Sequence, residues 1–219
     1  MHQSAHDQME RLVDDYLRPG VHYRVVDLGS RTSGRQKMTH RDLFAGHSCT
    51  IIGVDVAPGR NVDLLMKKPY RLPIRSNSAD VVISGQAFEH IPFFWASLLE
   101  ITRVLKPNGL VFLTAPSRGH VHTAVDCWRY YPDGLRAMAT FAGLTVLEAN
   151  TDFPPITGKR QHDYKAIETP YRYWGDSVGV FQKPVRRPRL TSAVVREVVV
   201  WWANRVGDIS EAPTSRPGS

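Results

Sequence analysis

Two apolar runs that each end in an acidic residue constrain the fold of this 219-residue chain most. Val25-Val26-Asp27-Leu28-Gly29 leads through an acid to a glycine, and Thr50-Ile51-Ile52-Gly53-Val54-Asp55 again ends in an acid. Glycine at a strand end permits positive φ and lets a ligand approach the backbone. Acids at the carboxyl ends of two early strands are typical of a doubly wound sheet that binds its ligand there. The dinucleotide fingerprint G-x-G-x-x-G is absent, since Arg31 stands where its second glycine would be, and this favours a nucleoside without a pyrophosphate.

Hydrophobic periodicity predicts the elements around those two runs. The fold class is α/β, a doubly wound, seven-stranded and mostly parallel sheet whose last strand is antiparallel. Continuous apolar runs such as 80–84 are expected of parallel strands that are covered on both faces. The predicted strands are 23–28, 50–55, 62–65, 80–84, 110–114, 144–148 and 178–182, and the predicted helices are 7–18, 36–46, 92–106, 132–142 and 191–205.

The chain length and an apolar content of 42% suit one domain with appendages. We expect an N-terminal helix over 1–20, a main domain over 21–183 with insertions near 116–131 and 151–174, a linker and amphipathic helix over 184–206, and a disordered tail over 207–219. The helix could pack on its own domain, form a homodimer contact or lie on a membrane surface.

The formal net charge of +7 could indicate nucleic acid or an anionic membrane as a partner. Much of the excess lies together in the run KPVRRPR, residues 183–189, which favours a solvated basic linker instead. The N-terminal residues lack the apolar core of a signal peptide, and no apolar run is long enough to span a bilayer. We therefore expect a cytoplasmic protein without a transmembrane segment.

Four motifs, in order, resemble those of class I S-adenosyl-L-methionine-dependent methyltransferases: VVDLGSRTSG, GVDVAPGRNVDL, NSADVVISGQAFEHI and LKPNGLVFLTAP. The first departs from the usual D-x-G-x-G-x-G of that family. The resemblance implies a Rossmann-like domain that uses S-adenosyl-L-methionine and releases S-adenosyl-L-homocysteine. The block DCWRYYPDGLRAMATFAGL further resembles bacterial methyltransferases of glycan synthesis, such as the mannoside O-methyltransferases of mycobacterial methylmannose polysaccharide synthesis. It implies O-methylation in polysaccharide biosynthesis.

Within that resemblance, Asp55 is expected to accept hydrogen bonds from both ribose hydroxyls of the cofactor. The alternative is a carboxylate that caps its own loop. Asp27 and the Gly29 backbone are expected to face the methionine end, where Arg31 could meet the carboxylate or remain an exposed loop residue. The predicted cofactor-binding residues are Asp27, Gly29, Ser30, Arg31, Asp55, Val56, Leu72 (against the adenine), Ser84, Gly85 and Gln86.

The acceptor side is predicted in 116–131, a loop over the carboxyl edge of the sheet. A histidine near neutral pKa is a natural general base, and a neighbouring carboxylate would orient it. We predict His122 as the base, with Asp126 or Glu89 as its orienting group and His120 as the second choice. Glu89 and His90 are expected near the acceptor, or else as a pair that holds the loop. The same residues could ligate a divalent ion, but they lack the fixed spacing of a metal motif, so no metal is favoured.

Polar and aromatic residues in the insertions suit a sugar, which has an apolar face and a rim of hydroxyls. The predicted substrate-binding residues are Phe88, Trp128, Arg129, Tyr130 and Tyr164. The leading hypothesis is an O-methyltransferase of a small saccharide or glycosylated metabolite. The alternatives are a C- or N-methyltransferase of another small molecule, an RNA methyltransferase, which lacks support from an N-P-P-Y type loop, and a noncatalytic cofactor-binding scaffold.

Overall fold

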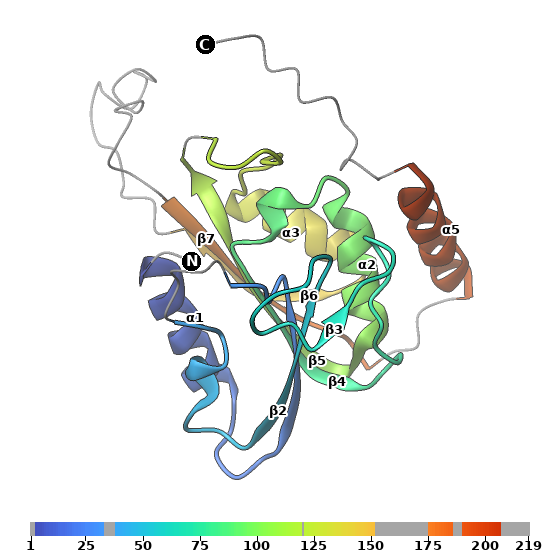
Figure 1. Cartoon of the computed structure of the whole chain (residues 1–219). Helices are drawn as coiled ribbons and strands as arrows, with labels where there is room; N and C mark the ends of the chain where they lie inside the picture. The colour runs from blue at the N-terminus through green and yellow to red at the C-terminus, as the bar shows by residue number, and fades with distance from the viewer. Residues whose placement is uncertain (1–2, 33–37, 120, 152–174, 186–189, 207–219) are drawn as a thin grey trace.

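The computed structural model describes residues 3–32, 38–119, 121–151, 175–185 and 190–206. These residues form one seven-stranded sheet in the order β3-β2-β1-β4-β5-β7-β6 (Figure 1). β7 runs antiparallel to β5 and β6, which lie on either side of it, and all the other strand pairs are parallel. The predicted mixed sheet is therefore confirmed. Its strands are β1 (Tyr23–Leu28), β2 (Cys49–Asp55), β3 (Leu64–Leu65), β4 (Ala79–Gly85), β5 (Leu105–Arg118), β6 (Thr145–Thr151) and β7 (Gly175–Gln182).

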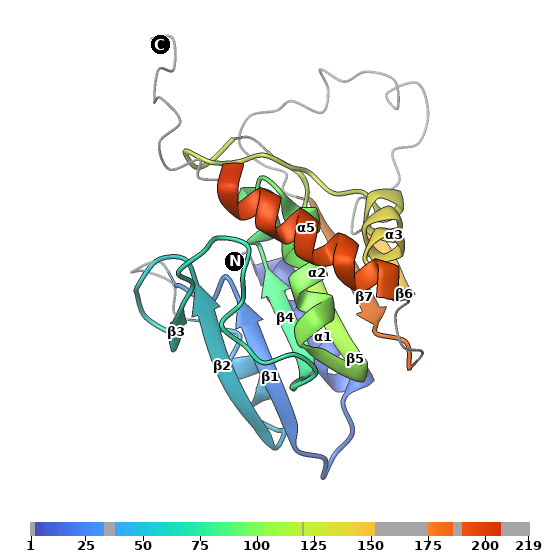
Figure 2. The same cartoon turned by 90° about the vertical axis from the view of Figure 1, so that its right-hand side faces the viewer.

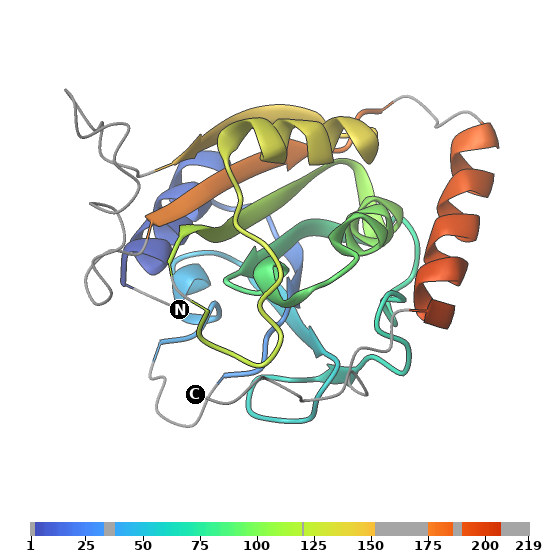
Figure 3. The same cartoon turned by 90° about the horizontal axis from the view of Figure 1, so that it is seen from above.

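Helices cover both faces of the sheet, as Figures 1 and 3 show. The helix α1 (Gln3–Tyr16) lies on one face, where Met9, Leu12 and Val13 pack in a cluster with inward residues of the central strands such as Phe112. The helices α2 (Phe94–Val104) and α3 (Pro132–Phe141) cover the other face, and α5 (Leu190–Val206) packs against α2 on that side. Neighbouring strand residues such as Val25 and Val26 belong to opposite clusters, because side chains alternate across a strand.

Two predicted elements differ most from the structure. The helix expected over 36–46 is absent from its described part, residues 38–46, which hold only the 3-10 turn η1 (Asp42–Phe44). There the Asp42 carboxylate accepts hydrogen bonds from the backbone N–H and the hydroxyl of Thr39, at 2.7 and 3.1 Å, a local bonding pattern that competes with a longer helix. Strand β5 also starts earlier than predicted. Leu105 already pairs with Ala79, and an irregularity separates this pair from the next.

The C-terminal helix α5 packs against α2 of its own domain (Figure 2). Val200 and Ala203 are buried in the core on that face of the sheet. Farther along the same side, the Asn204 side-chain oxygen accepts a hydrogen bond from the backbone N–H of Tyr70 at 2.9 Å. The outer side of α5 exposes Val194 and Trp201, among others. Among the described helices, none combines the length and the apolarity that a bilayer crossing requires.

Candidate functional site

A small polar cavity opens at the carboxyl ends of β1 and β4, the edge at which the sequence predicted a ligand. Its volume is about 80 Å³. Six of the residues that line it belong to the predicted cofactor-binding set, and the seventh is His40. The lining residues are Asp27, Gly29, Ser30, Arg31, His40, Gly85 and Gln86.

Two glycines bring bare backbone to this cavity. Gly29 has a φ of +79°, and a Cβ added there would lie 2.5 Å from the Cβ of Ala87. A Cβ on Gly85 would lie 2.6 Å from Nε2 of His40. Both distances are too short for non-bonded atoms, so a side chain at either position would collide with its neighbour. The close packing of the segments that follow β1 and β4 therefore requires glycine at both positions, and at Gly29 the positive φ requires it as well.

His40 is a site residue that sequence reasoning missed. Its Nδ1 lies 2.7 Å from Oδ1 of Asp27, and both side chains are buried. The residue lies just before η1, in a segment that the sequence predicted as an ordinary crossover helix. The only sequence signal was a run of polar residues, Thr39 to Asp42, where an apolar stripe would be expected. The pair fixes the direction of the Asp27 carboxylate at the floor of the cavity.

Asp55 ends β2 beside this cavity and caps its loop. Its Oδ2 accepts a hydrogen bond from the backbone N–H of Arg31, and its Oδ1 accepts one from that of Ala57, both at 3.0 Å. A carboxylate oxygen has two lone pairs, so these bonds leave acceptor capacity on each oxygen. Val56 beside it is exposed. Ribose binding by Asp55 stays a prediction, and the loop-capping alternative is present in the structure.

Of three other predicted cofactor residues, Ser84 and Leu72 do not line the cavity, whereas Gln86 does. Ser84 is buried and donates its hydroxyl to the Leu28 carbonyl at 2.9 Å. Leu72, expected against the adenine, lies in the core on the α2 side. Gln86, with a φ of +56°, lines the cavity and donates its amide to Oδ1 of Asp176 at 3.0 Å. Ser84 and Leu72 are therefore buried residues outside the lining of the cavity.

The acceptor loop holds a chain of charged contacts that ends at His122. Arg129 donates to both oxygens of the Asp126 carboxylate. This guanidinium contact holds the pKa of Asp126 well below its usual range. The Oδ2 atom of Asp126 lies 2.9 Å from Nδ1 of His122. The same oxygen also accepts a hydrogen bond from the His122 backbone N–H. An ionised carboxylate at Nδ1 places the proton on that nitrogen and makes Nε2 the reactive one.

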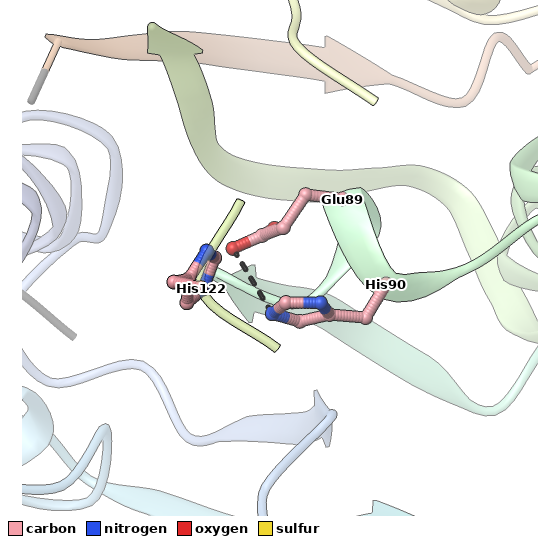
Figure 4. A group of neighbouring side chains, drawn as sticks. All are labelled: Glu89, His90 and His122. Atoms are coloured by element: carbon pink, nitrogen blue, oxygen red, sulfur yellow. Dashed lines mark ion pairs between the residues drawn. The ribbon is translucent and has the colours of Figure 1, made fainter. Parts of the chain in front are cut away.

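Glu89 and His90, on the 3-10 turn η2 (Phe88–His90), lie next to His122 (Figure 4). Oε1 of Glu89 is 3.6 Å from Nε2 of His90, and the two imidazole rings have centroids 5.0 Å apart. Burial raises the pKa of Glu89 to about 7. Burial also lowers the pKa of His90. The structure thus brings together four of the five predicted catalytic residues, and the fifth, His120, lies outside the described residues.

The predicted substrate-binding aromatics are mostly packed inside. Phe88 and Tyr130 are buried, and the Tyr130 hydroxyl donates to the Phe88 carbonyl at 3.0 Å. Trp128 is half-buried, with its indole N–H directed to the Ile91 and Pro92 carbonyls, both at 3.1 Å. Tyr164 lies outside the described residues. Trp128 and Tyr130, at the end of the acceptor loop, thus pack against η2 and the residues that follow it.

Comparisons with known proteins support a methyltransferase domain in this chain. A family model described as a methyltransferase domain matches residues 33–113. Demethylmenaquinone methyltransferase of Staphylococcus saprophyticus is 28% identical over 98 residues, which are 39% of this chain and 42% of that protein. The chain thus spans about two fifths of the length of this curated relative.

Solved structures of the same fold include the [4+2]-cyclase SpnF, with a TM-score of 0.60 and 19% identity over 84% of each chain. Another is phosphoethanolamine N-methyltransferase 2 of Haemonchus contortus, bound to S-adenosylhomocysteine, with a TM-score of 0.55 and 14% identity over 81% of this chain and 52% of that one. At these identities the likeness shows the fold alone. The family model supports a methyltransferase domain over residues 33–113, and the sheet order is that of the class I S-adenosylmethionine-dependent methyltransferase fold.

Proposed function

We propose that this chain transfers a methyl group from S-adenosylmethionine to a hydroxyl of a small saccharide or glycosylated metabolite. The observation that carries the proposal is the Arg129–Asp126–His122 chain, which orients a histidine on the loop that follows β5. The glycine-lined cavity at the ends of β1 and β4 supports binding of the cofactor at the same edge of the sheet. The cytoplasmic location and the homodimer expected from the sequence stay predictions.

The proposed chemistry needs little from the protein beyond position and a base. S-adenosylmethionine supplies a methyl group already activated by the positive charge on its sulfur. The acceptor oxygen forms a bond to that methyl carbon while the carbon–sulfur bond breaks, and S-adenosylhomocysteine leaves. His122 takes the hydroxyl proton at Nε2, and Asp126 stabilises the imidazolium that results. Holding the acceptor in line contributes roughly 7–11 kcal/mol in favourable cases.

An apolar acceptor is a second candidate, and one feature of the structure favours it. A groove of about 750 Å³ runs between α2, α3 and α5, lined almost wholly by apolar side chains that include Phe94 and Trp201. The Phe94 ring lies 5.2 Å from that of Trp128 and 5.6 Å from that of Tyr130, measured between centroids, so the aromatic lining of the groove is in contact with the end of the acceptor loop. The relative from Staphylococcus is named for the methylation of demethylmenaquinone.

Product analysis separates these acceptors. The purified chain would be incubated with methyl-labelled S-adenosylmethionine and with manno-oligosaccharides, gluco-oligosaccharides or a short-chain demethylmenaquinone, and the products would be identified by mass spectrometry. We expect label on a sugar oxygen. Label on the quinone alone would replace the saccharide proposal with the second candidate. If S-adenosylhomocysteine binds but no acceptor gains label, the noncatalytic scaffold is favoured.

A further inference from the structure

Three side chains with metal-binding atoms converge beside the acceptor loop. One ligand atom each from Glu89, His90 and His122 lies within 4.8 Å of the others. Figure 4 shows the Glu89 carboxylate directed between the two imidazoles. Glu89 is 1% exposed, and no described residue hydrogen-bonds to its Oε2. A buried carboxylate oxygen without a donor is costly unless a proton or a cation compensates it.

The outer contacts of both histidines match those of metal ligands. Nδ1 of His90 lies 2.6 Å from the Val125 carbonyl, so it carries the proton and leaves Nε2 as the ligating atom. Nδ1 of His122 is held in the same way by Asp126. Histidines that bind metals typically donate their other ring N–H to a carbonyl or a carboxylate, which fixes the tautomer and the direction of the ring. Arg129 holds the Asp126 carboxylate in this position by donating a hydrogen bond to its Oδ2.

We propose that Glu89, His90 and His122 bind a divalent transition-metal ion such as Zn²⁺. Two imidazole nitrogens and one carboxylate suit such ions better than Mg²⁺ or Ca²⁺, which prefer oxygen ligands. Three protein ligands leave a coordination position open. Binding requires only a local closure, because ligand atoms around a tetrahedral Zn²⁺ lie about 3.3 Å apart when each metal–ligand bond is roughly 2.0–2.1 Å.

The bound ion occupies the same ring nitrogen that methyl transfer uses. Nε2 of His122 cannot hold a metal ion and accept a proton from the acceptor at once. Occupancy therefore inhibits methyl transfer, and a chelator restores it. This consequence rests on the proposed function, whereas metal binding itself does not.

Calorimetric titration of the full chain with Zn²⁺ tests the proposal. A second group of candidate ligands, His6, Asp7 and Glu10, lies on α1, so the titration uses His6→Ala as its background. We expect one ion per chain in that background. Adding Glu89→Gln or His90→Asn should weaken binding at least 100-fold. Adding Asp126→Asn, which removes an outer contact, should weaken it about 10–100-fold.

Two further measurements guard the interpretation. Circular dichroism and thermal melting check that each variant is folded, and the Co²⁺ absorption spectrum reports on the ligands independently of affinity. Unchanged Zn²⁺ affinity in the Glu89 and His90 variants, loss of all binding in His6→Ala alone, or absence of binding at micromolar Zn²⁺ would overturn the proposal. Failure of the proposed function gives a different result, namely Zn²⁺ binding by a chain that transfers no methyl group even with chelator.

Discussion

Replacing His122 by alanine is expected to slow methyl transfer by about 10²–10⁴-fold, the usual contribution of a positioned general base. The affinity for S-adenosylhomocysteine should stay within a few-fold, because His122 lies on the acceptor loop and does not line the cavity at the ends of β1 and β4. The measurement is the single-turnover rate with excess chelator, which removes any effect of metal ions.

His22→Ala is the matched control for this variant. His22 is also an exposed histidine with both ring nitrogens near hydroxyls, those of Ser48 and Thr50, at 2.8 and 3.0 Å. It precedes β1, at the amino-terminal end of the strand and so away from the cavity. We expect the wild-type rate there and an intermediate loss in Asp126→Asn. If His122→Ala kept its rate, the assignment of His122 as the base would be wrong.

Replacing Glu100 by alanine is expected to lower the free energy of unfolding by about 3–5 kcal/mol, the cost of breaking a buried ion pair. Glu100 and Arg103 are both buried on α2. The Glu100 carboxylate accepts hydrogen bonds from Nε of Arg103 at 2.8 Å and from the Leu72 backbone N–H at 3.1 Å. Without the Glu100 carboxylate, the buried Arg103 guanidinium loses its counter-charge, and the buried Leu72 N–H loses its hydrogen-bond acceptor. Urea unfolding followed by circular dichroism measures the change.

Asp133→Ala provides the surface comparison for Glu100→Ala. Asp133 pairs with Arg136 at 2.9 Å across one helical turn of α3, and its side chain is 98% exposed. An exposed pair of this kind contributes about 0–1 kcal/mol, because solvent screens it. If both variants lowered the free energy of unfolding equally, the buried contacts of Glu100 would not stabilise α2 more than an exposed ion pair does.

The strand pattern was predictable from the sequence because burial on both faces leaves a direct signal. Strands covered on both faces need apolar residues on both sides, so the continuous apolar runs Val25 to Gly29 and Thr50 to Asp55 locate β1 and β2 in the sequence. The crossover after β1 was not predictable in the same way. There, the Asp42 carboxylate bonds to Thr39 and favours a turn over a helix, an outcome set by local side-chain bonds rather than by periodicity.

Site residues that lie at strand ends were predictable from the sequence, whereas those brought to the site by tertiary packing were not. Asp27, Gly29 and Gly85 lie at the cavity because strands of a parallel sheet end at one edge. His40 reaches it from a separate segment, and the polar run Thr39 to Asp42 does not by itself indicate a contact with Asp27. Phe88 and Tyr130 read equally well as sugar-binding or core residues, and only the tertiary structure shows that they are buried.

Calorimetry with S-adenosylhomocysteine tests the central claim most directly, that a nucleoside cofactor lies at the carboxyl ends of β1, β2 and β4. The wild-type chain should bind it, and Asp55→Ala should abolish binding. Asp80→Ala is the control, since Asp80 also accepts a backbone N–H, that of Arg24 at 2.9 Å, but lies at the opposite end of β4. We expect wild-type affinity in that variant. Undiminished binding by Asp55→Ala, or no binding by the folded wild-type chain, would contradict the account.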